Sequence, residues 1–141
     1  MIAAPALLGT AAPAGPAAQD VQVTVTGLRS DAGVVRACMT TDAALFPRCG
    51  ADSHSYRVVA PAGHPLVLDF GPVEPGRYAI ALLHDENDNG IADRAAGMIP
   101  REGYGFSRDA KVRMGPPAFD KAVFEVGPAP VRQVIRMRYM L

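Results

Sequence analysis

The stretch Val21-Gln22-Val23-Thr24-Val25-Thr26 alternates an apolar with a polar residue at every position. Successive side chains of a β-strand point to opposite faces, so this stretch predicts a strand with one buried and one exposed face. Residues 34–39 predict a second strand, and Asp31-Ala32-Gly33 supplies turn-forming residues between the two. We therefore expect residues 21–39 to form a β-hairpin.

The same period of two continues along most of the chain and predicts an all-β fold. Turn residues recur at close spacing, and no amphipathic helix is indicated. About seven short strands in one domain, placed at residues 19–141, favour an antiparallel β-sandwich of immunoglobulin-like or transthyretin-like type. Residues 97–115 are rich in glycine and are expected to form an ordered excursion without regular structure. The remaining strands are expected at residues 56–60, 66–70, 77–83, 119–126 and 131–139.

Residues 1–18 differ from the rest of the chain, because they carry no charge and consist largely of alanine and proline. Ala12-Pro13-Ala14 fits the small-x-small pattern at which signal peptides are cleaved. We interpret residues 1–18 as the remnant of a signal peptide, with a disordered Ala/Pro tail as the alternative. No stretch is long and apolar enough to predict a transmembrane segment. The predicted location is therefore the periplasm or the outside of the cell.

Cys38 and Cys49 are the two cysteines of the chain and lie eleven positions apart. In an oxidising compartment we expect them to form a disulfide that closes the loop between them. Closing a loop of this length stabilises a fold by roughly 3 kcal/mol on the chain-entropy model. Two free buried thiols are the alternative if the protein is cytosolic.

The charge balance argues against nucleic acid as a partner. The chain has 14 basic and 14 acidic residues, and the basic residues are scattered. A nucleic-acid-binding protein is expected to carry a basic patch, which this pattern does not predict.

An acidic, Asn-rich loop at residues 85–93 predicts a calcium site. Calcium prefers six to eight oxygen ligands, which alternate residues of a curved loop can supply. Side chains at the first, third, fifth and ninth positions and a carbonyl at the seventh match the first part of an EF-hand loop. The expected ligands are Asp85, Asn87, Asn89, Ile91 and Asp93.

Two features set this loop apart from an EF-hand. Ala96 stands where an EF-hand has its bidentate glutamate, and no flanking helices are predicted. We therefore expect weak calcium binding, suited to the calcium levels outside cells. A metal-free turn is the alternative, because Asp and Asn favour turns without any metal.

Three motifs in order give the chain a resemblance to a known family. They are His84-Asp85-x-Asn87-x-Asn89-Gly90-x-x-Asp93, then Pro100-x-Glu102-Gly103-Tyr104-Gly105-Phe106-Ser107, then Gly115-Pro116-Pro117-x-Phe119. With these motifs the chain resembles the bacterial domain of unknown function 2141 (DUF2141). The resemblance implies an exported protein and brings no established activity. The Cys38–Cys49 pair departs from the family pattern.

Three aromatic residues suggest a binding surface for a glycan or peptide. Tyr104 and Phe106 lie in a glycine-rich stretch, and Phe119 follows two prolines. Rigid aromatic side chains provide contact area at low entropic cost. The alternative is that they pack against the end of the fold, since large aromatic residues are usually well buried.

The sequence favours a non-enzymatic protein without excluding an enzyme. Ser107 lacks the surroundings of a catalytic serine, and no other catalytic set is indicated. We expect a binding or structural module, with calcium as a cofactor and an unidentified extracytoplasmic ligand or protein as its partner. The alternative function is a periplasmic carbohydrate-active or hydrolase-like enzyme that uses carboxylates near the calcium loop, such as Glu102 and Asp109.

Overall fold

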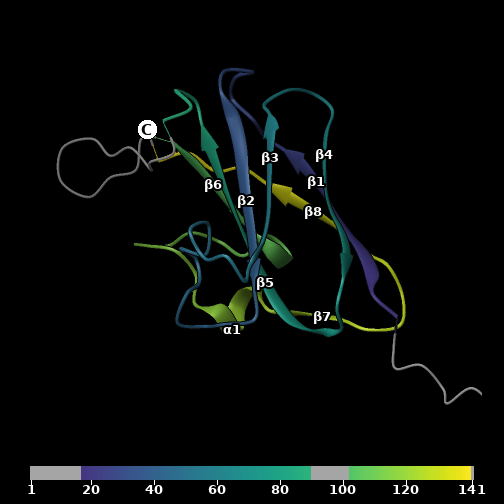
Figure 1. Cartoon of the computed structure of the whole chain (residues 1–141). Helices are drawn as coiled ribbons and strands as arrows, with labels where there is room; N and C mark the ends of the chain where they lie inside the picture. The colour runs from purple at the N-terminus through teal and green to yellow at the C-terminus, as the bar shows by residue number, and fades with distance from the viewer. Residues whose placement is uncertain (1–16, 90–101, 141) are drawn as a thin grey trace, which may run out of the picture.

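The computed structural model of the protein describes residues 17–89 and 102–140. Within these residues the chain forms two β-sheets and very little helix (Figure 1). The predicted all-β fold is therefore confirmed. The predicted signal-peptide remnant at residues 1–18 falls almost wholly outside the described residues.

The smaller sheet has three strands in the order β4-β1-β8. The central strand β1 is antiparallel to β4 and parallel to β8. The β1–β8 pairing departs from the antiparallel arrangement that the sequence suggested. The bounds are Gln19–Thr26 for β1, Leu66–Val73 for β4 and Val131–Arg136 for β8.

The larger sheet has the order β3-β2-β5-β6, and β7 also pairs with β5. All of its pairings are antiparallel. Strand β6 lies in the glycine-rich stretch, so the expectation of no regular structure there is wrong for these residues. The bounds are Val34–Thr40 for β2, Tyr56–Pro61 for β3, Gly76–Asp85 for β5, Gly103–Phe106 for β6 and Phe124–Val126 for β7.

The predicted hairpin of residues 21–39 is also wrong, because β1 and β2 belong to different sheets. The connection of residues 27–33 crosses from one sheet to the other, and Leu28 within it is buried. Alternating residues show which face of a strand is buried, but they do not show which strand lies beside it. The buried valines of β1 and Val35 of β2 belong to the same core but lie in different sheets.

The facing sides of the two sheets share one hydrophobic core, here called the inner core. In β5, Tyr78, Ile80 and Leu82 point into it, whereas Ala79 and Ala81 point to the opposite side. The inner core contains buried side chains from both sheets: Val21, Val23, Val25, Leu28, Val35, Ala37, Met39, Leu66, Leu68, Phe70, Val73, Tyr78, Ile80, Leu82, Val126, Ile135 and Met137.

A second, smaller group of buried residues covers part of the outer face of the larger sheet. Here the connection between β2 and β3 lies on the same side of the sheet as the short helix α1, Phe119–Ala122 (Figure 1). This outer cluster consists of Cys38, Phe46, Cys49, Ala79, Ala81, Phe106 and Ala122.

Helix α1 replaces the first part of the strand that the sequence predicted at residues 119–126. Phe119, Ala122 and Val123 have the i, i+3, i+4 spacing of one helical turn, and the Val123 N–H donates to the Phe119 carbonyl at 2.9 Å. The other helical element is a 3-10 turn, η1, at Ser107–Asp109. Neither of these helices of the described chain has the length and apolar character needed to cross a membrane.

Candidate functional site: the acidic loop and the outer face

The acidic loop begins at the last residue of β5, Asp85, whose side chain is fully buried. One carboxylate oxygen, Oδ2, accepts a hydrogen bond from Arg36 Nε at 2.8 Å. The other, Oδ1, accepts the backbone N–H of Asn89 at 3.2 Å. A buried carboxylate needs such partners to stay charged. Asp85 therefore fixes the loop to β2 and closes its first turn.

Arg36 bridges two carboxylates of this loop. It lies on the outer face of β2, and its Nη2 atom contacts Asp88 Oδ1 at 2.7 Å. The hydrogen bond with Asp85 raises the pKa of Arg36 above its ordinary value. A calcium ion at Asp85 would thus have to share this carboxylate with a guanidinium group, which opposes cation binding. The sequence offered one signal for this role, because Arg36 is the only charged residue among residues 34–39.

The predicted calcium ligands are only partly within the described chain. The side chains of Asn87 and Asn89 are exposed in the same turn as Asp85, whereas Ile91 and Asp93 lie outside the described residues. Within residues 17–89 and 102–140 no three His, Cys, Asp or Glu side chains form a metal-binding group. The oxygen atoms of this turn are of the kind that binds calcium. The ion pairs of Asp85 and Asp88 with Arg36 oppose the binding of a cation.

A second ion pair holds the start of the loop to the connection between β1 and β2. Glu86 accepts hydrogen bonds from Arg29, including one from Nε at 2.9 Å, and from Ser30 Oγ at 2.8 Å. The hydrogen bond from Arg29 lowers the pKa of Glu86. The Arg29 guanidinium also lies 4.5 Å from the centre of the Tyr139 ring, a cation–π contact.

His84 is fully buried, and both of its ring nitrogens form hydrogen bonds. Nε2 lies 2.8 Å from the Ala32 carbonyl oxygen, and Nδ1 lies 2.6 Å from the Tyr139 hydroxyl. Because a carbonyl only accepts, Nε2 must carry a proton. These hydrogen bonds give His84 a structural role near the end of β5.

Two glycines allow the backbone to approach closely here. A Cβ atom at Gly33 would lie 2.0 Å from the Asp85 carbonyl oxygen, and the φ of Gly33 is +68°. A Cβ atom at Gly103 would lie 2.4 Å from the Tyr139 ring. Neither position has room for a side chain. Gly103 of the family motif is therefore explained by packing.

The outer face of the larger sheet contains a hollow with a volume of about 1330 Å³. It lies between the connection that follows β2 and the segment that precedes α1. The described residues that line it are Arg36, Ala37, Cys38, Ala44, Leu45, Phe46, Pro47, Arg48, Gly50, Ala51, Ser55, Arg57, Val59, Ala81, Leu82, Leu83, Tyr104, Phe106, Val112, Met114, Gly115, Pro116 and Met140.

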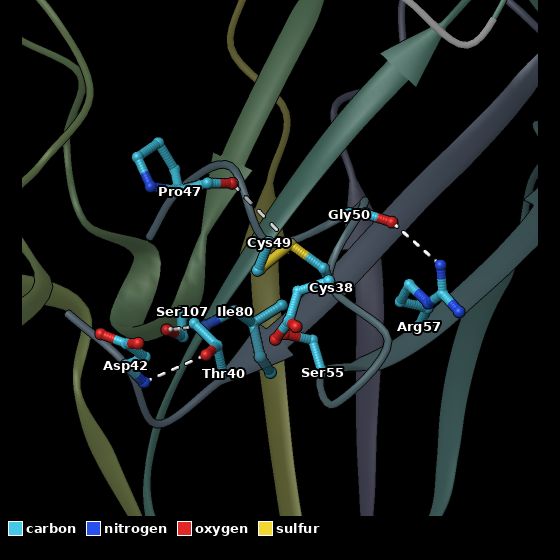
Figure 2. The surroundings of a disulfide bond; sticks show 11 residues. Cys38, Thr40, Asp42, Pro47, Cys49, Gly50, Ser55, Arg57, Ile80 and Ser107 are labelled. Atoms are coloured by element: carbon cyan, nitrogen blue, oxygen red, sulfur yellow. Dashed lines mark hydrogen bonds between the residues drawn. A yellow bond between two sulfur atoms is a disulfide. The ribbon is translucent and has the colours of Figure 1, made fainter. Parts of the chain in front are cut away.

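The Cys38–Cys49 disulfide, confirmed by the structure, fixes one wall of the outer hollow (Figure 2). The Thr40 hydroxyl accepts the Asp42 N–H at 3.0 Å, and Arg57 Nη1 donates to the Gly50 carbonyl at 3.2 Å. These contacts attach both ends of the disulfide loop to the sheet. The disulfide and these hydrogen bonds therefore hold this wall in place.

The three aromatic residues predicted as a binding surface have different surroundings. Phe106 is 1% exposed and packs edge-on against Phe46, with ring centres 5.8 Å apart. Phe119 is half-buried and also packs edge-on against Phe46, with ring centres 6.0 Å apart. Tyr104 is half-buried and, with Phe106, lines the outer hollow. Phe106 therefore forms part of the floor of the hollow and is not an exposed aromatic residue.

Ser107 is a buried residue whose hydroxyl connects two backbone segments. Its buried hydroxyl accepts the Ile80 N–H at 2.9 Å and donates to the Ala122 carbonyl at 2.6 Å. Strand β5 pairs with β7 up to Tyr78 and with β6 from Ala81. The hydrogen bond between Ser107 and Ile80, drawn in Figure 2, fills the gap between these two ladders. The hydrogen bond from Ser107 to the Ala122 carbonyl also links α1 to the sheet.

The carboxylates proposed for an enzyme lie at opposite ends of β6. Glu102 precedes this strand and Asp109 follows it, and four residues of strand span about 13 Å. Asp109 is ion-paired with Arg138 at 3.1 Å. A glycosidase pair needs carboxylates roughly 5–9.5 Å apart. The described geometry therefore does not favour this pair.

A family model described as "Uncharacterized protein conserved in bacteria (DUF2141)" matches residues 23–133 of the chain. This match covers well over half of the sequence and runs from within β1 to within the last strand, β8. No curated protein and no solved structure matches the chain.

Proposed function

The chain belongs to this family of uncharacterised bacterial proteins, and on that premise we propose that it is an exported, non-enzymatic binding module. Its fold is taken to be a β-sandwich of immunoglobulin-like or transthyretin-like type. The observation that carries the proposal is the outer hollow, whose wall is held by a disulfide. Ligand sites in proteins are mostly concave, apolar and formed in advance, as this hollow is.

Export is supported by the disulfide, because such bonds persist in the periplasm and outside cells and are rare in the cytosol. The test is a fusion of the chain, expressed from its natural start, to alkaline phosphatase, which is active only after export. Removal of residues 1–18 serves as the control and should abolish phosphatase activity. Equal activity of both fusions, or none from either, would contradict export through this segment.

Calcium binding at residues 85–93 is part of the proposal and is supported by the oxygen-rich turn at Asp85. The ligands are Asp85, Asn87, Asn89, Ile91 and Asp93, with Arg36 as an internal competitor for the first of them. Ligands that bind only the native state raise its melting temperature. Millimolar calcium should therefore raise the melting temperature, and the same concentration of magnesium should raise it less.

Two variants separate a metal site from a plain turn. Asn87→Ala with Asn89→Ala removes two exposed ligands and should abolish the calcium effect without unfolding the protein. Arg36→Met removes the competing guanidinium, so the variant should melt lower without calcium and gain more from calcium than the natural chain. No calcium-dependent change in any of the three proteins would remove the metal from the proposal.

A further inference from the structure

The exposed apolar side chains of the described chain gather at the outer hollow. Five large hydrophobic residues are exposed, and three of them, Val59, Met114 and Met140, line the hollow. A contiguous group of exposed apolar residues marks a surface that receives a partner. Methionine side chains in particular adapt to ligands of varied shape.

The charged side chains among the described lining residues of the hollow are all of one sign. Its described lining contains Arg36, Arg48 and Arg57 and no carboxylate. Arg36 is neutralised by Asp85 and Asp88, as described above. Neither Arg48 nor Arg57 forms an ion pair within residues 17–89 and 102–140. Two basic side chains thus border an apolar surface, which is complementary to a ligand with an acidic head and an apolar body.

Asp52 interacts with the charge of Arg57, but its hydrogen bonds go to other residues. Its oxygens accept hydrogen bonds from Ser55 Oγ at 2.8 Å and from the His54 N–H at 3.3 Å. The hydrogen bond from Ser55, more than the charge of Arg57, lowers the pKa of Asp52. Arg57 itself donates to the Gly50 carbonyl, which is neutral. Its positive charge is therefore still available to a bound anion.

The lining favours an alkyl chain over a peptide as the apolar body. A peptide brings backbone N–H and C=O groups that need hydrogen-bond partners when buried. Most of the lining side chains have no such partners to offer, because they are apolar, for example Leu45, Leu83 and Val112. An alkyl chain needs none. The volume of about 1330 Å³ exceeds roughly 1,000 Å³, the upper end of the range for common ligand pockets. The hollow therefore has enough volume for a long alkyl chain.

We propose that the outer hollow binds a long-chain fatty acid, with the chain along the apolar lining and the carboxylate at Arg48 and Arg57. This inference rests on the proposed binding function and names its ligand class. The disulfide supports it by fixing the wall that carries Arg48, which lies beside Cys49. Hydrogen bonds between a guanidinium and a carboxylate are stronger than those between neutral groups.

The test uses the oxidised full chain and a fluorescent fatty acid, 11-(dansylamino)undecanoic acid, displaced by palmitate. We expect saturable binding in the micromolar range. Dodecyltrimethylammonium, a cationic amphiphile, should displace the probe at least tenfold less well than dodecanoate. Equal displacement by the two amphiphiles would overturn the role of the arginines.

Matched variants locate the site. Val59→Asp should weaken probe binding at least tenfold, whereas Val67→Asp should leave it unchanged. The two valines are 54% and 53% exposed, but Val67 lies in the smaller sheet, away from the hollow. Arg48→Gln with Arg57→Gln should weaken binding about tenfold, and Arg77→Gln with Arg132→Gln should not. Melting curves of each variant show that it is folded.

The outcomes separate this inference from the proposed function. If an acidic apolar peptide binds in a manner sensitive to Val59→Asp and the fatty acid does not, the ligand class is wrong and the binding module stands. If neither the fatty acid nor a peptide or glycan array gives binding that Val59→Asp weakens, both are wrong. Fatty-acid binding that is insensitive to Val59→Asp would overturn the inference as well.

Discussion

The two faces of the larger sheet are built from the same strands and differ in how they are covered. On the inner face, β2 and β5 pack against a complete second sheet, and their side chains are almost wholly buried. On the outer face, a disulfide-linked connection and one short helix cover only part of the surface. The hollow lies where this cover ends. The fully packed face stabilises the fold, and the half-covered face of the same sheet is the one at which we propose that a ligand binds.

A substitution on each face of β5 should give the largest contrast. Ile80→Ala on the inner face should lower the free energy of unfolding by about 3 kcal/mol, because it leaves a cavity in a closed core. Leu83→Ala on the outer face should cost less than about 1 kcal/mol, since the side chain is half-buried and water can fill the space. Urea unfolding measures both. Similar losses would mean that the outer face is packed as tightly as the inner one.

Loss of the disulfide should affect the outer face first. Cys38→Ala with Cys49→Ala should lower the free energy of unfolding by about 3 kcal/mol, because the loop closure no longer restricts the unfolded chain. Limited proteolysis should then cut the connection at residues 41–55 before the strands. Chemical reduction of the natural chain is the control and should give the same loss. If cleavage instead begins in the strands, the disulfide supports the core as a whole.

Ser107 connects the outer cover to the sheet, and its removal should have an intermediate effect. Ser107→Ala leaves the Ile80 N–H and the Ala122 carbonyl without the partner they now share. An unsatisfied buried group costs roughly 1–3 kcal/mol, so we expect a loss of about 2 kcal/mol in urea unfolding. Ser55→Ala, a half-buried serine of the same face, is the control. An equal effect of the two would argue against a linking role for Ser107.

The ion pair of Glu86 should give the smallest effect and a characteristic pH dependence. Its pKa is lowered in the folded protein from an ordinary 4.5, so it stabilises the fold above that pH, and this stabilisation is lost as the pH falls through the folded pKa. Glu86→Gln should therefore cost less than about 1 kcal/mol at pH 7 and nothing once the carboxyl is protonated. Melting temperatures between pH 3 and 7 measure this. A constant difference over that range would contradict it.

Local patterns predicted the strands well and predicted their partners badly. The alternation at residues 21–26 correctly assigned the buried side of β1, because burial of every second residue is a local property of a strand. The same pattern wrongly paired β1 with β2, since both present an apolar face and the choice of partner depends on distant segments. Helix α1 was missed because one helical turn is too short to leave a clear period.

The candidate site could be predicted only in part. The acidic loop was placed correctly at the end of β5, and Cys38 and Cys49 are joined as expected. The role of Arg36 as the partner of Asp85 was not apparent, because the two residues are 49 positions apart and meet only when β2 pairs with β5. The three aromatic residues were named as candidates for a binding surface, but the sequence did not show which residues they contact. Phe106 was a candidate for a binding surface, with packing against the end of the fold as the alternative, and its contact with Phe46 buries it.

The sequence by itself determined the family, the class of fold, the disulfide and the position of the acidic loop. Each of these depends on residue types and their spacing along the chain, either within one element or within a sequence motif. Tertiary structure decided which strands share a sheet, that Arg36 holds Asp85, and that the outer face has a hollow bordered by arginines. The physical reason is the same for all three. They arise from contacts between distant segments, whose energies depend on the packing of the whole chain.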